Sequence, residues 1–136
     1  MNPSQEPLQG RIDKVLDFHR IFQLHYATSP EHVSPAMAEL RHRLMAEEND
    51  EYLEACRAGD MAEIADALGD KLYILLGTII THGMQHKIFD VFDEIHRSNL
   101  SKLDAEGKPI FREDGKIMKG PTFFRPDIRK VLGVEK

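Results

Sequence analysis

The sequence predicts an all-α fold, an antiparallel bundle of four to five helices with a short irregular or hairpin C-terminal tail. Two observations predict this class. Apolar residues recur at helical spacing through four segments between residues 8 and 101, and Ser, Pro, Gly and Asp residues separate these segments where helices start and stop. After residue 101 the periodicity ends. We therefore predict one domain over residues 1–136.

Four helices are expected, over about residues 8–26, 35–58, 60–82 and 86–101, with a tail over 102–136. The first ends before Pro30, because proline disfavours helical geometry at the residue before it. Ser34 is the expected N-cap of the second helix, with Pro35 at its first position. Gly59 is expected to end the second helix in a left-handed conformation.

The third and fourth helices are marked by similar signals. Asp60 is the expected N-cap of the third, since Glu63 follows three residues later, and the helix continues to just before Gly83. The fourth carries an apolar stripe of Ile88, Val91, Phe92 and Ile95. In the tail, the turn signals Glu106-Gly107 and Asp114-Gly115 flank short apolar pairs, which predicts a small hairpin.

Composition excludes several classes of protein. The chain of 136 residues is 41% hydrophobic, enough for a core, but its longest apolar run, 72–76, is far shorter than the ~20 residues of a membrane span. The first thirty residues do not resemble a signal peptide. A lone Cys56 excludes an intrachain disulfide and a Cys-pair zinc site. With a net charge of −5, we expect a cytoplasmic protein that binds neither nucleic acid nor membranes.

Charge is distributed unevenly along the chain. Residues 31–66 hold ten acidic and three basic side chains, whereas residues 97–130 hold nine basic and five acidic ones. This pattern fits two oppositely charged surfaces that attract each other. It fits equally well a cation site in the first segment and an anion-binding site in the second.

Carboxylates on the predicted third helix point to the first of these sites. At 100° per residue, Asp66, Asp70 and Tyr73 fall near Glu63, on a helix that is otherwise apolar nearly all round and is expected to be buried. An unpaired buried carboxylate costs several kcal/mol or becomes protonated. Lys71 projects about 100° from Asp70 along an ideal helix. A metal ion is therefore the expected partner.

The predicted second helix supplies matching carboxylates. Glu48 and Glu51 are three residues apart and Glu47 and Glu51 four, so each pair shares a face. A short loop makes the two helices antiparallel neighbours, which can bring these acids opposite Glu63 and Asp66. Oxygen ligands without thiolates suit Mg²⁺ or Mn²⁺. A solvated acidic face is the competing interpretation.

These motifs resemble a known family. Glu48-x-x-Glu51 followed by Glu63-x-x-Asp66 is similar to the all-α nucleoside-triphosphate pyrophosphohydrolase superfamily, which includes MazG-like proteins, dimeric dUTPases and phosphoribosyl-ATP pyrophosphohydrolase. The segment 96–102 resembles the family's sequence after the fourth helix, and the tail segments 107–112 and 119–121 resemble the phosphoribosyl-ATP pyrophosphohydrolase-like branch. The resemblance spans roughly residues 38–128.

The resemblance implies hydrolysis between the α- and β-phosphates of a nucleoside triphosphate, giving a nucleoside monophosphate and pyrophosphate. It implies that Glu48, Glu51, Glu63 and Asp66 bind Mg²⁺, with Mn²⁺ as a substitute. Glu47 is the implied residue that orients or deprotonates the attacking water. Divalent ions that bridge phosphate oxygens suit this chemistry, because phosphoryl transfer depends mostly on positioning and charge neutralisation.

The resemblance also implies substrate contacts and an assembly. Asp70 and Tyr73 are expected to line a nucleoside pocket, Asn99 to contact the base or sugar, and Lys102 and Lys119 to contact phosphate. A homodimer or homotetramer is expected. The substrate is expected to be a (deoxy)nucleoside triphosphate, dUTP-like or non-standard, in house-cleaning of the nucleotide pool, with phosphoribosyl-ATP as the alternative.

Two alternatives belong to other classes. A carboxylate-bridged di-iron bundle needs Glu-x-x-His pairs, and Glu39-x-x-His42 is one, although His42 lies two turns before Glu48. The other alternative is a non-catalytic, nucleotide-binding helical dimer, which would bind nucleotide without releasing pyrophosphate.

Overall fold

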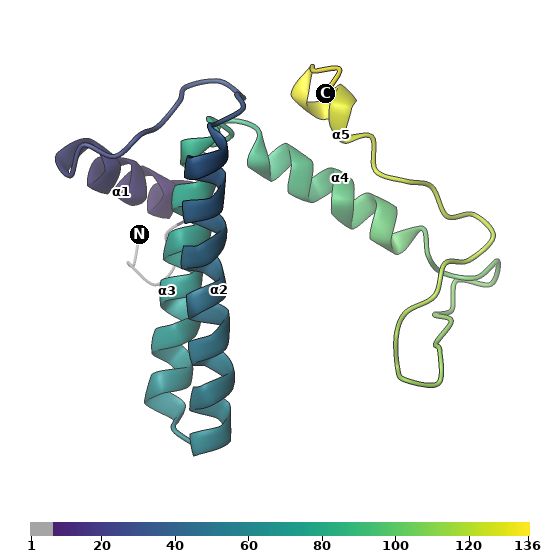
Figure 1. Cartoon of the computed structure of the whole chain (residues 1–136). Helices are drawn as coiled ribbons and strands as arrows, with labels where there is room; N and C mark the ends of the chain where they lie inside the picture. Colours follow the sequence, from purple (N-terminus) through teal and green to yellow (C-terminus); the bar gives the residue numbers. More distant parts are fainter. Residues whose placement is uncertain (1–6) are drawn as a thin grey trace. The chain divides into compact units, whose positions relative to one another are not determined.

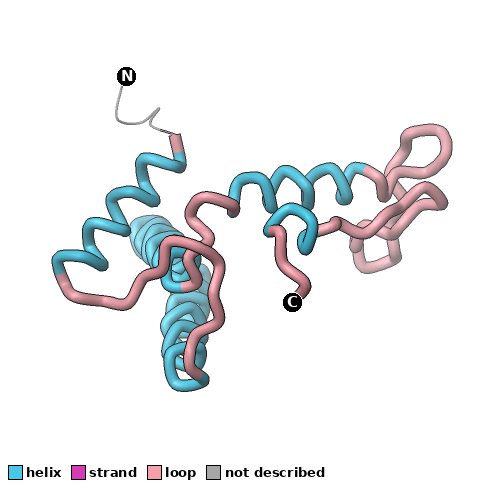
Figure 2. The backbone as a smooth tube through the Cα atoms, turned by 90° about the horizontal axis from the view of Figure 1, so that it is seen from above, coloured by secondary structure: helices cyan, strands magenta, loops and turns pink. Residues whose placement is uncertain are grey.

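The computed structural model describes residues 7–136, and this part of the chain forms five helices: α1 (Leu8–Ile21), α2 (Pro35–Ala58), α3 (Met61–Thr81), α4 (Ile88–Leu100) and α5 (Ile128–Leu132) (Figure 1). The described residues contain no strand (Figure 2). The predicted all-α class is therefore confirmed. No helix in this part of the chain is both long and apolar enough to cross a membrane.

The chain divides into two compact units, Met1–Gln85 and His86–Lys136. The first unit holds α1, α2 and α3, and the second holds α4, α5 and the tail. The single catalytic domain over residues 1–136 stays a prediction.

Local capping explains the bounds of α2 and α3. The Ser34 hydroxyl accepts a hydrogen bond from the Met37 amide at 3.1 Å, and Asp60 accepts one from the Glu63 amide at 3.2 Å. Gly59 has a φ of +66°, which glycine adopts without steric cost, and it ends α2. These caps are the predicted ones. The predicted bounds 35–58 match α2, and the predictions for α3 and α4 are within two residues of the observed ends.

The predicted end of the first helix, at residue 26, is wrong, because α1 ends at Ile21. The chain turns at Gln23, which has a φ of +58°, and the Leu24 amide donates back to the His19 carbonyl at 2.8 Å. The segment then runs to the end of α3, where the Ala27 amide donates to the Ile80 carbonyl at 3.2 Å. The segment after Ile21 thus makes a hydrogen bond to α3 where the apolar spacing predicts a last turn of the first helix.

In the first unit, α2 and α3 lie side by side in opposite directions, and α1 packs against the C-terminal half of α3 (Figures 1 and 2). The core of this packing includes Ile12 and Val15 of α1 and Leu76 and Ile80 of α3. The other half of α3 is less covered than expected. Leu68 is 50% exposed and Leu72 is 42% exposed, so within one chain α3 is not the fully buried helix that its composition predicts.

Gly77 lets three helices approach closely at a buried polar junction. A Cβ atom at this position would lie 2.7 Å from a terminal guanidinium nitrogen of Arg41 and 3.0 Å from Nε2 of His19. Arg41 is buried and donates from Nε to the Thr78 hydroxyl at 3.1 Å and from a terminal nitrogen to the Ile74 carbonyl at 2.9 Å. The junction therefore ties α2 to α3 and seats His19 of α1 beside them.

We predict that acid destabilises this junction through His19, which is only 3% exposed. Burial, and less strongly the charges of Arg41 and His25, lower the pKa of His19, although its bond to the His25 carbonyl opposes this effect. The unfolded chain therefore takes up a proton near pH 6.5, before the folded chain does. Stability is retained above that pH and falls below it, by up to about 1.4 kcal/mol per pH unit for this group.

Urea unfolding at pH 7.5 and at pH 5.5 measures this effect. The loss of unfolding free energy between the two values should be smaller in His19→Gln than in the wild type. His42→Gln, which changes an exposed histidine of α2, is the control and should keep the wild-type loss. An equal loss in His19→Gln and the wild type would contradict the prediction.

In the second unit, the tail is fastened to α4 around Phe124. The Ser98 hydroxyl donates to the Phe124 carbonyl at 2.8 Å, and the Phe124 amide donates to the Ser101 hydroxyl at 3.1 Å. The Arg97 guanidinium lies 4.4 Å from the centre of the Phe124 ring. The tail is thus irregular but held in place.

The predicted hairpin in the tail is present only as a turn with one antiparallel bridge, between Phe111 and Ile117. The Met118 amide donates to the Ile110 carbonyl at 2.7 Å beside it. This agrees with a short irregular or hairpin tail. The short helix α5 follows near its end.

Candidate active site

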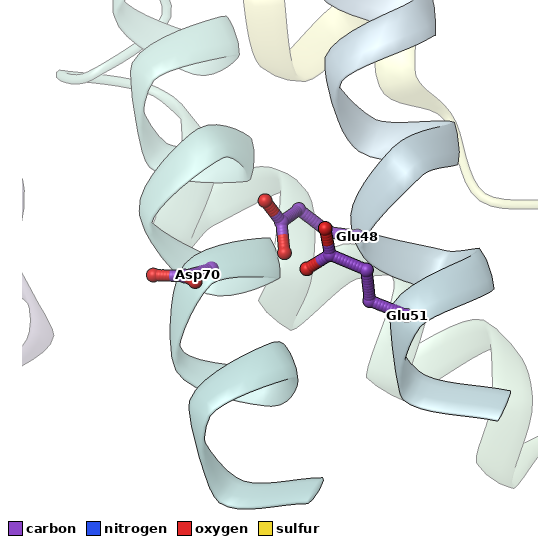
Figure 3. Close-up of side chains that lie close together, drawn as sticks. All are labelled: Glu48, Glu51 and Asp70. Atoms are coloured by element: carbon purple, nitrogen blue, oxygen red, sulfur yellow. The ribbon is translucent and has the colours of Figure 1, made fainter. Parts of the chain in front are cut away.

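Three carboxylates from α2 and α3 converge in the first unit. Glu48 and Glu51 project from α2 toward α3, which carries Asp70 (Figure 3). One carboxylate oxygen from each residue lies within 4.8 Å of the corresponding oxygens of the other two. Glu48 is half-buried, whereas Glu51 and Asp70 are exposed. We call these three residues the carboxylate cluster.

Glu48 is the most perturbed member of the carboxylate cluster. Burial raises its pKa, and hydrogen bonding to Glu51 and the negative charges of Glu51, Asp70 and Asp66 raise it further. In the described part of the chain, one oxygen of Glu48 is buried without a hydrogen-bond partner. A buried acceptor surrounded by like charges is unfavourable unless a cation binds it. The cluster therefore suits a cation with oxygen ligands.

Lys71 follows Asp70 directly but donates its hydrogen bond elsewhere. Its Nζ lies 2.7 Å from Oδ1 of Asn49, an uncharged amide oxygen. Oxygen donors without sulfur or imidazole fit a hard divalent ion such as Mg²⁺ or Mn²⁺. The donor set thus agrees with the kind of metal predicted from the sequence.

The other two predicted ligands, Glu63 and Asp66, lie one to two turns before Asp70 on α3. Together with Glu51 they line an open surface hollow of about 250 Å³ between α2 and α3. Asp66 is close enough to raise the pKa of Glu48. Glu51 therefore belongs to both groups, since it is a member of the carboxylate cluster and also lines the hollow. Glu63 and Asp66 line the hollow but are not members of the cluster.

Glu47, the predicted water-activating residue, is exposed and precedes Glu48 on α2. It belongs neither to the carboxylate cluster nor to the lining of the hollow, as far as the described residues go. His42, which the di-iron alternative needs, is also exposed and outside the cluster. An Fe-binding Glu-x-x-His arrangement is therefore not assembled around these carboxylates.

Tyr73, predicted to line a nucleoside pocket, lies one turn beyond Asp70 and is 40% exposed. Its ring meets the Phe18 ring of α1 edge to face, with 5.6 Å between centres. Phe22 extends this contact, since its ring centre lies 4.4 Å from that of Phe18. An aromatic surface from α1 and α3 thus begins one turn from the carboxylate cluster.

The remaining predicted substrate-binding residues belong to the second unit. Asn99 and Lys102 line a surface hollow of about 400 Å³. Its other lining residues are Leu100, Leu103, Pro109 and Ile117. The Lys119 ammonium lies 4.9 Å from the centre of the Phe123 ring. Roles for these three polar residues stay predictions.

Asp70 joins the acids for which the sequence predicts a metal partner, although the resemblance implies a nucleoside contact for it. Its carboxylate lies with those of Glu48 and Glu51. Its spacing of four residues from Asp66 places both on one face of α3, and that spacing was the available signal.

Comparison with known proteins agrees with this geometry. The family described as phosphoribosyl-ATP pyrophosphohydrolase matches residues 15–99. This range includes α2, α3, the four predicted metal ligands and the predicted water-activating residue Glu47. No curated protein matches the chain. Members of this family are hydrolases that act on phosphoric anhydrides with the help of a divalent metal. Because the match spans more than half of its length, the chain belongs to the phosphoribosyl-ATP pyrophosphohydrolase family, within the MazG-like all-α superfamily.

Proposed function

We propose that this pyrophosphohydrolase cleaves a nucleoside triphosphate between the α- and β-phosphates, with Mg²⁺ as its metal. The observation that supports this most is the carboxylate cluster of Glu48, Glu51 and Asp70, in which one Glu48 oxygen is buried without a hydrogen-bond partner among residues 7–136. In a family that acts on phosphoric anhydrides, such a cluster is suited to hold the ion that binds the phosphates.

In this proposal, Glu48, Glu51, Glu63 and Asp66 hold the metal, and Asp70 joins them through its place in the carboxylate cluster. A bound Mg²⁺, or Mn²⁺ in its place, supplies neutralisation of the triphosphate charge. The antiparallel pairing of α2 and α3 brings the carboxylates together before the substrate arrives. Little reorganisation is then needed as charge develops on the phosphate oxygens.

Glu47 is the proposed general base. As the water oxygen bonds to one phosphorus of the α–β anhydride, the bridging P–O bond breaks and a water proton passes to the Glu47 carboxylate. Pyrophosphate and a nucleoside monophosphate leave. The exposure of Glu47 supports this role, because a water molecule can reach its carboxylate.

We propose that Tyr73 and Asn99 contact the nucleoside and that Lys102 and Lys119 contact phosphate. Tyr73, which is 40% exposed, offers a surface for a base or sugar near the carboxylate cluster. Asn99 offers both a donor and an acceptor beside an apolar lining, and Lys102 offers a point charge for phosphate. Lys119 is the weakest of the four, since its ammonium already lies against the Phe123 ring.

The proposed substrate is a (deoxy)nucleoside triphosphate, dUTP-like or non-standard, in a cytoplasmic role of nucleotide house-cleaning. Phosphoribosyl-ATP is the second candidate, favoured by the description of the matching family. Products separated by ion-exchange chromatography, from a panel of dUTP, dITP, the common nucleotides and phosphoribosyl-ATP, decide between them. Turnover of phosphoribosyl-ATP alone would overturn the first choice, and turnover of dUTP or dITP alone would overturn the second.

We also propose that the chain assembles into a homodimer or homotetramer. Leu68 and Leu72 of α3 are about half-exposed, and Phe22, which directly follows α1, is 61% exposed. Taking such a side chain from full exposure to full burial contributes about 1.5–3 kcal/mol, so a second copy that covers the exposed part of each residue would gain a fraction of that. Size-exclusion chromatography with light scattering should give a mass at least twice 15.6 kDa. A stable monomer at micromolar concentration would contradict this prediction.

A further inference from the structure

We propose that Lys71 is a positioning residue, which holds α2 and α3 at the spacing that the carboxylate cluster needs through its hydrogen bond to Asn49. The inference rests on the proposed metal-binding function. The Lys71 Nζ of α3 donates to Oδ1 of Asn49 of α2 at 2.7 Å, across 22 positions of sequence. We call this contact the Asn49–Lys71 bridge.

The Asn49–Lys71 bridge lies at the level of the carboxylate cluster. Asn49 directly follows Glu48 on α2, and Lys71 directly follows Asp70 on α3. Successive residues of a helix project about 100° apart, so the bridge uses a different side of each helix from the acids. The bridge thus fixes the same two turns that carry the acids without occupying the space between them.

A contact that holds α2 against α3 is needed in the turns that carry the carboxylate cluster. The negative charges of the carboxylate cluster repel one another and push α2 away from α3. The other side-chain hydrogen bonds found between these two helices, within the described residues, come from Arg41 and reach Ile74 and Thr78, further along α3. Near the cluster, Leu68 and Leu72 of α3 are about half-exposed.

The chemistry of the Asn49–Lys71 bridge also suits this task. An ammonium that bound a cluster carboxylate directly would compete with the metal for that oxygen. Asn49 instead offers an uncharged amide oxygen, so Lys71 is held in place while the oxygens of Glu48, Glu51 and Asp70 stay available. Outer groups that orient metal ligands typically change metal affinity by about 10–100-fold.

Titration of the full-length chain with Mn²⁺ alone, by isothermal calorimetry, tests the proposal. Lys71→Met removes the ammonium but keeps an unbranched stem, and Asn49→Ala removes the acceptor. Each should weaken Mn²⁺ binding by about tenfold, toward the lower end of the usual range. The double variant should lose no more than either single one, because both changes break the same contact. The Mn²⁺ concentration for half-maximal turnover should rise by the same factor.

Two further variants separate positioning from charge. Lys71→Arg keeps a cationic donor and should retain most of the affinity. Arg57→Met removes a positive charge from an exposed position of α2 and should leave Mn²⁺ affinity and turnover unchanged. Circular dichroism and thermal melting of each variant confirm that it folds.

Several outcomes would overturn the proposal. If Lys71→Met weakens binding but Asn49→Ala does not, Lys71 acts independently of Asn49. If Arg57→Met weakens binding as much as Lys71→Met, the effect is not specific to the bridge. Wild-type affinity in both bridge variants removes the role of the bridge while leaving the proposed function intact. A wild-type chain that binds no Mn²⁺ overturns both.

Discussion

Replacing Glu48 by glutamine is expected to abolish most activity. The change removes one negative charge from the carboxylate cluster at nearly constant volume. Because Glu48 is a proposed ligand, the loss of metal affinity should exceed the ~10–100-fold effect typical of outer groups, and turnover at a fixed Mg²⁺ concentration should fall with it. Calorimetry with Mn²⁺ and steady-state pyrophosphate release measure the two losses.

The same variant should melt at a higher temperature than the wild type when no metal is present. In the wild type, the half-buried Glu48 faces Glu51 and Asp70, and one of its oxygens has no partner. A neutral amide relieves this repulsion. Asp50→Asn, which changes an exposed acid of α2 outside the cluster, is the matched control and should keep wild-type affinity. Unchanged Mn²⁺ affinity in Glu48→Gln would remove Glu48 from the metal site.

Replacing Glu47 by glutamine is expected to separate binding from catalysis. Glu47 lies outside the carboxylate cluster, so Mn²⁺ and nucleotide affinities should stay near those of the wild type. Turnover should fall by roughly 10²–10⁴-fold, as expected when a general base is lost. Equilibrium binding of a non-hydrolysable nucleotide and the rate of pyrophosphate release give the two quantities.

Glu39→Gln is the control for Glu47, since Glu39 is an exposed acid two turns earlier on the same helix. It should keep full turnover. A Glu47 variant with wild-type turnover would show that another group accepts the proton. A Glu47 variant that loses metal binding instead would assign Glu47 to the ligands.

Capping chemistry made most of the helix bounds predictable. Ser34, Gly59 and Asp60 act locally, through bonds to amides within three residues or through the conformational freedom of glycine, so their effect can be read from neighbouring residues. The end of α1 depends instead on a bond between Ala27 and Ile80, which are far apart in sequence. No local pattern in residues 20–26 encodes that bond.

The candidate site was predictable to the level of helical faces. Spacing placed Glu48 with Glu51 on α2 and placed Asp66 with Asp70 on α3. Which of these acids meet across the two helices depends on their axial register and rotation. Both depend on contacts between the helices, which include the buried Ala55 and Ala67 and the hydrogen bond from Arg41, and spacing along one helix does not reveal them. The sequence therefore indicated an acidic site but not the place of Asp70 beside Glu48.

The exposure of α3 has a similar explanation. Its apolar residues predict burial on several sides, but a single chain supplies only α1 and α2 as neighbours in the first unit. Apolar periodicity predicts which residues are buried from water. It does not predict whether the same chain or another copy covers them.

Pyrophosphate release, measured with and without Mg²⁺ for the wild type beside Glu48→Gln, tests the central claim most directly. With dUTP, dITP, the common nucleotides and phosphoribosyl-ATP as substrates, we predict metal-dependent release of pyrophosphate and a nucleoside monophosphate from at least one, and its loss in Glu48→Gln. Release of orthophosphate would contradict cleavage between the α- and β-phosphates. Release that continues without metal, or unchanged in Glu48→Gln, would contradict the role of the carboxylate cluster.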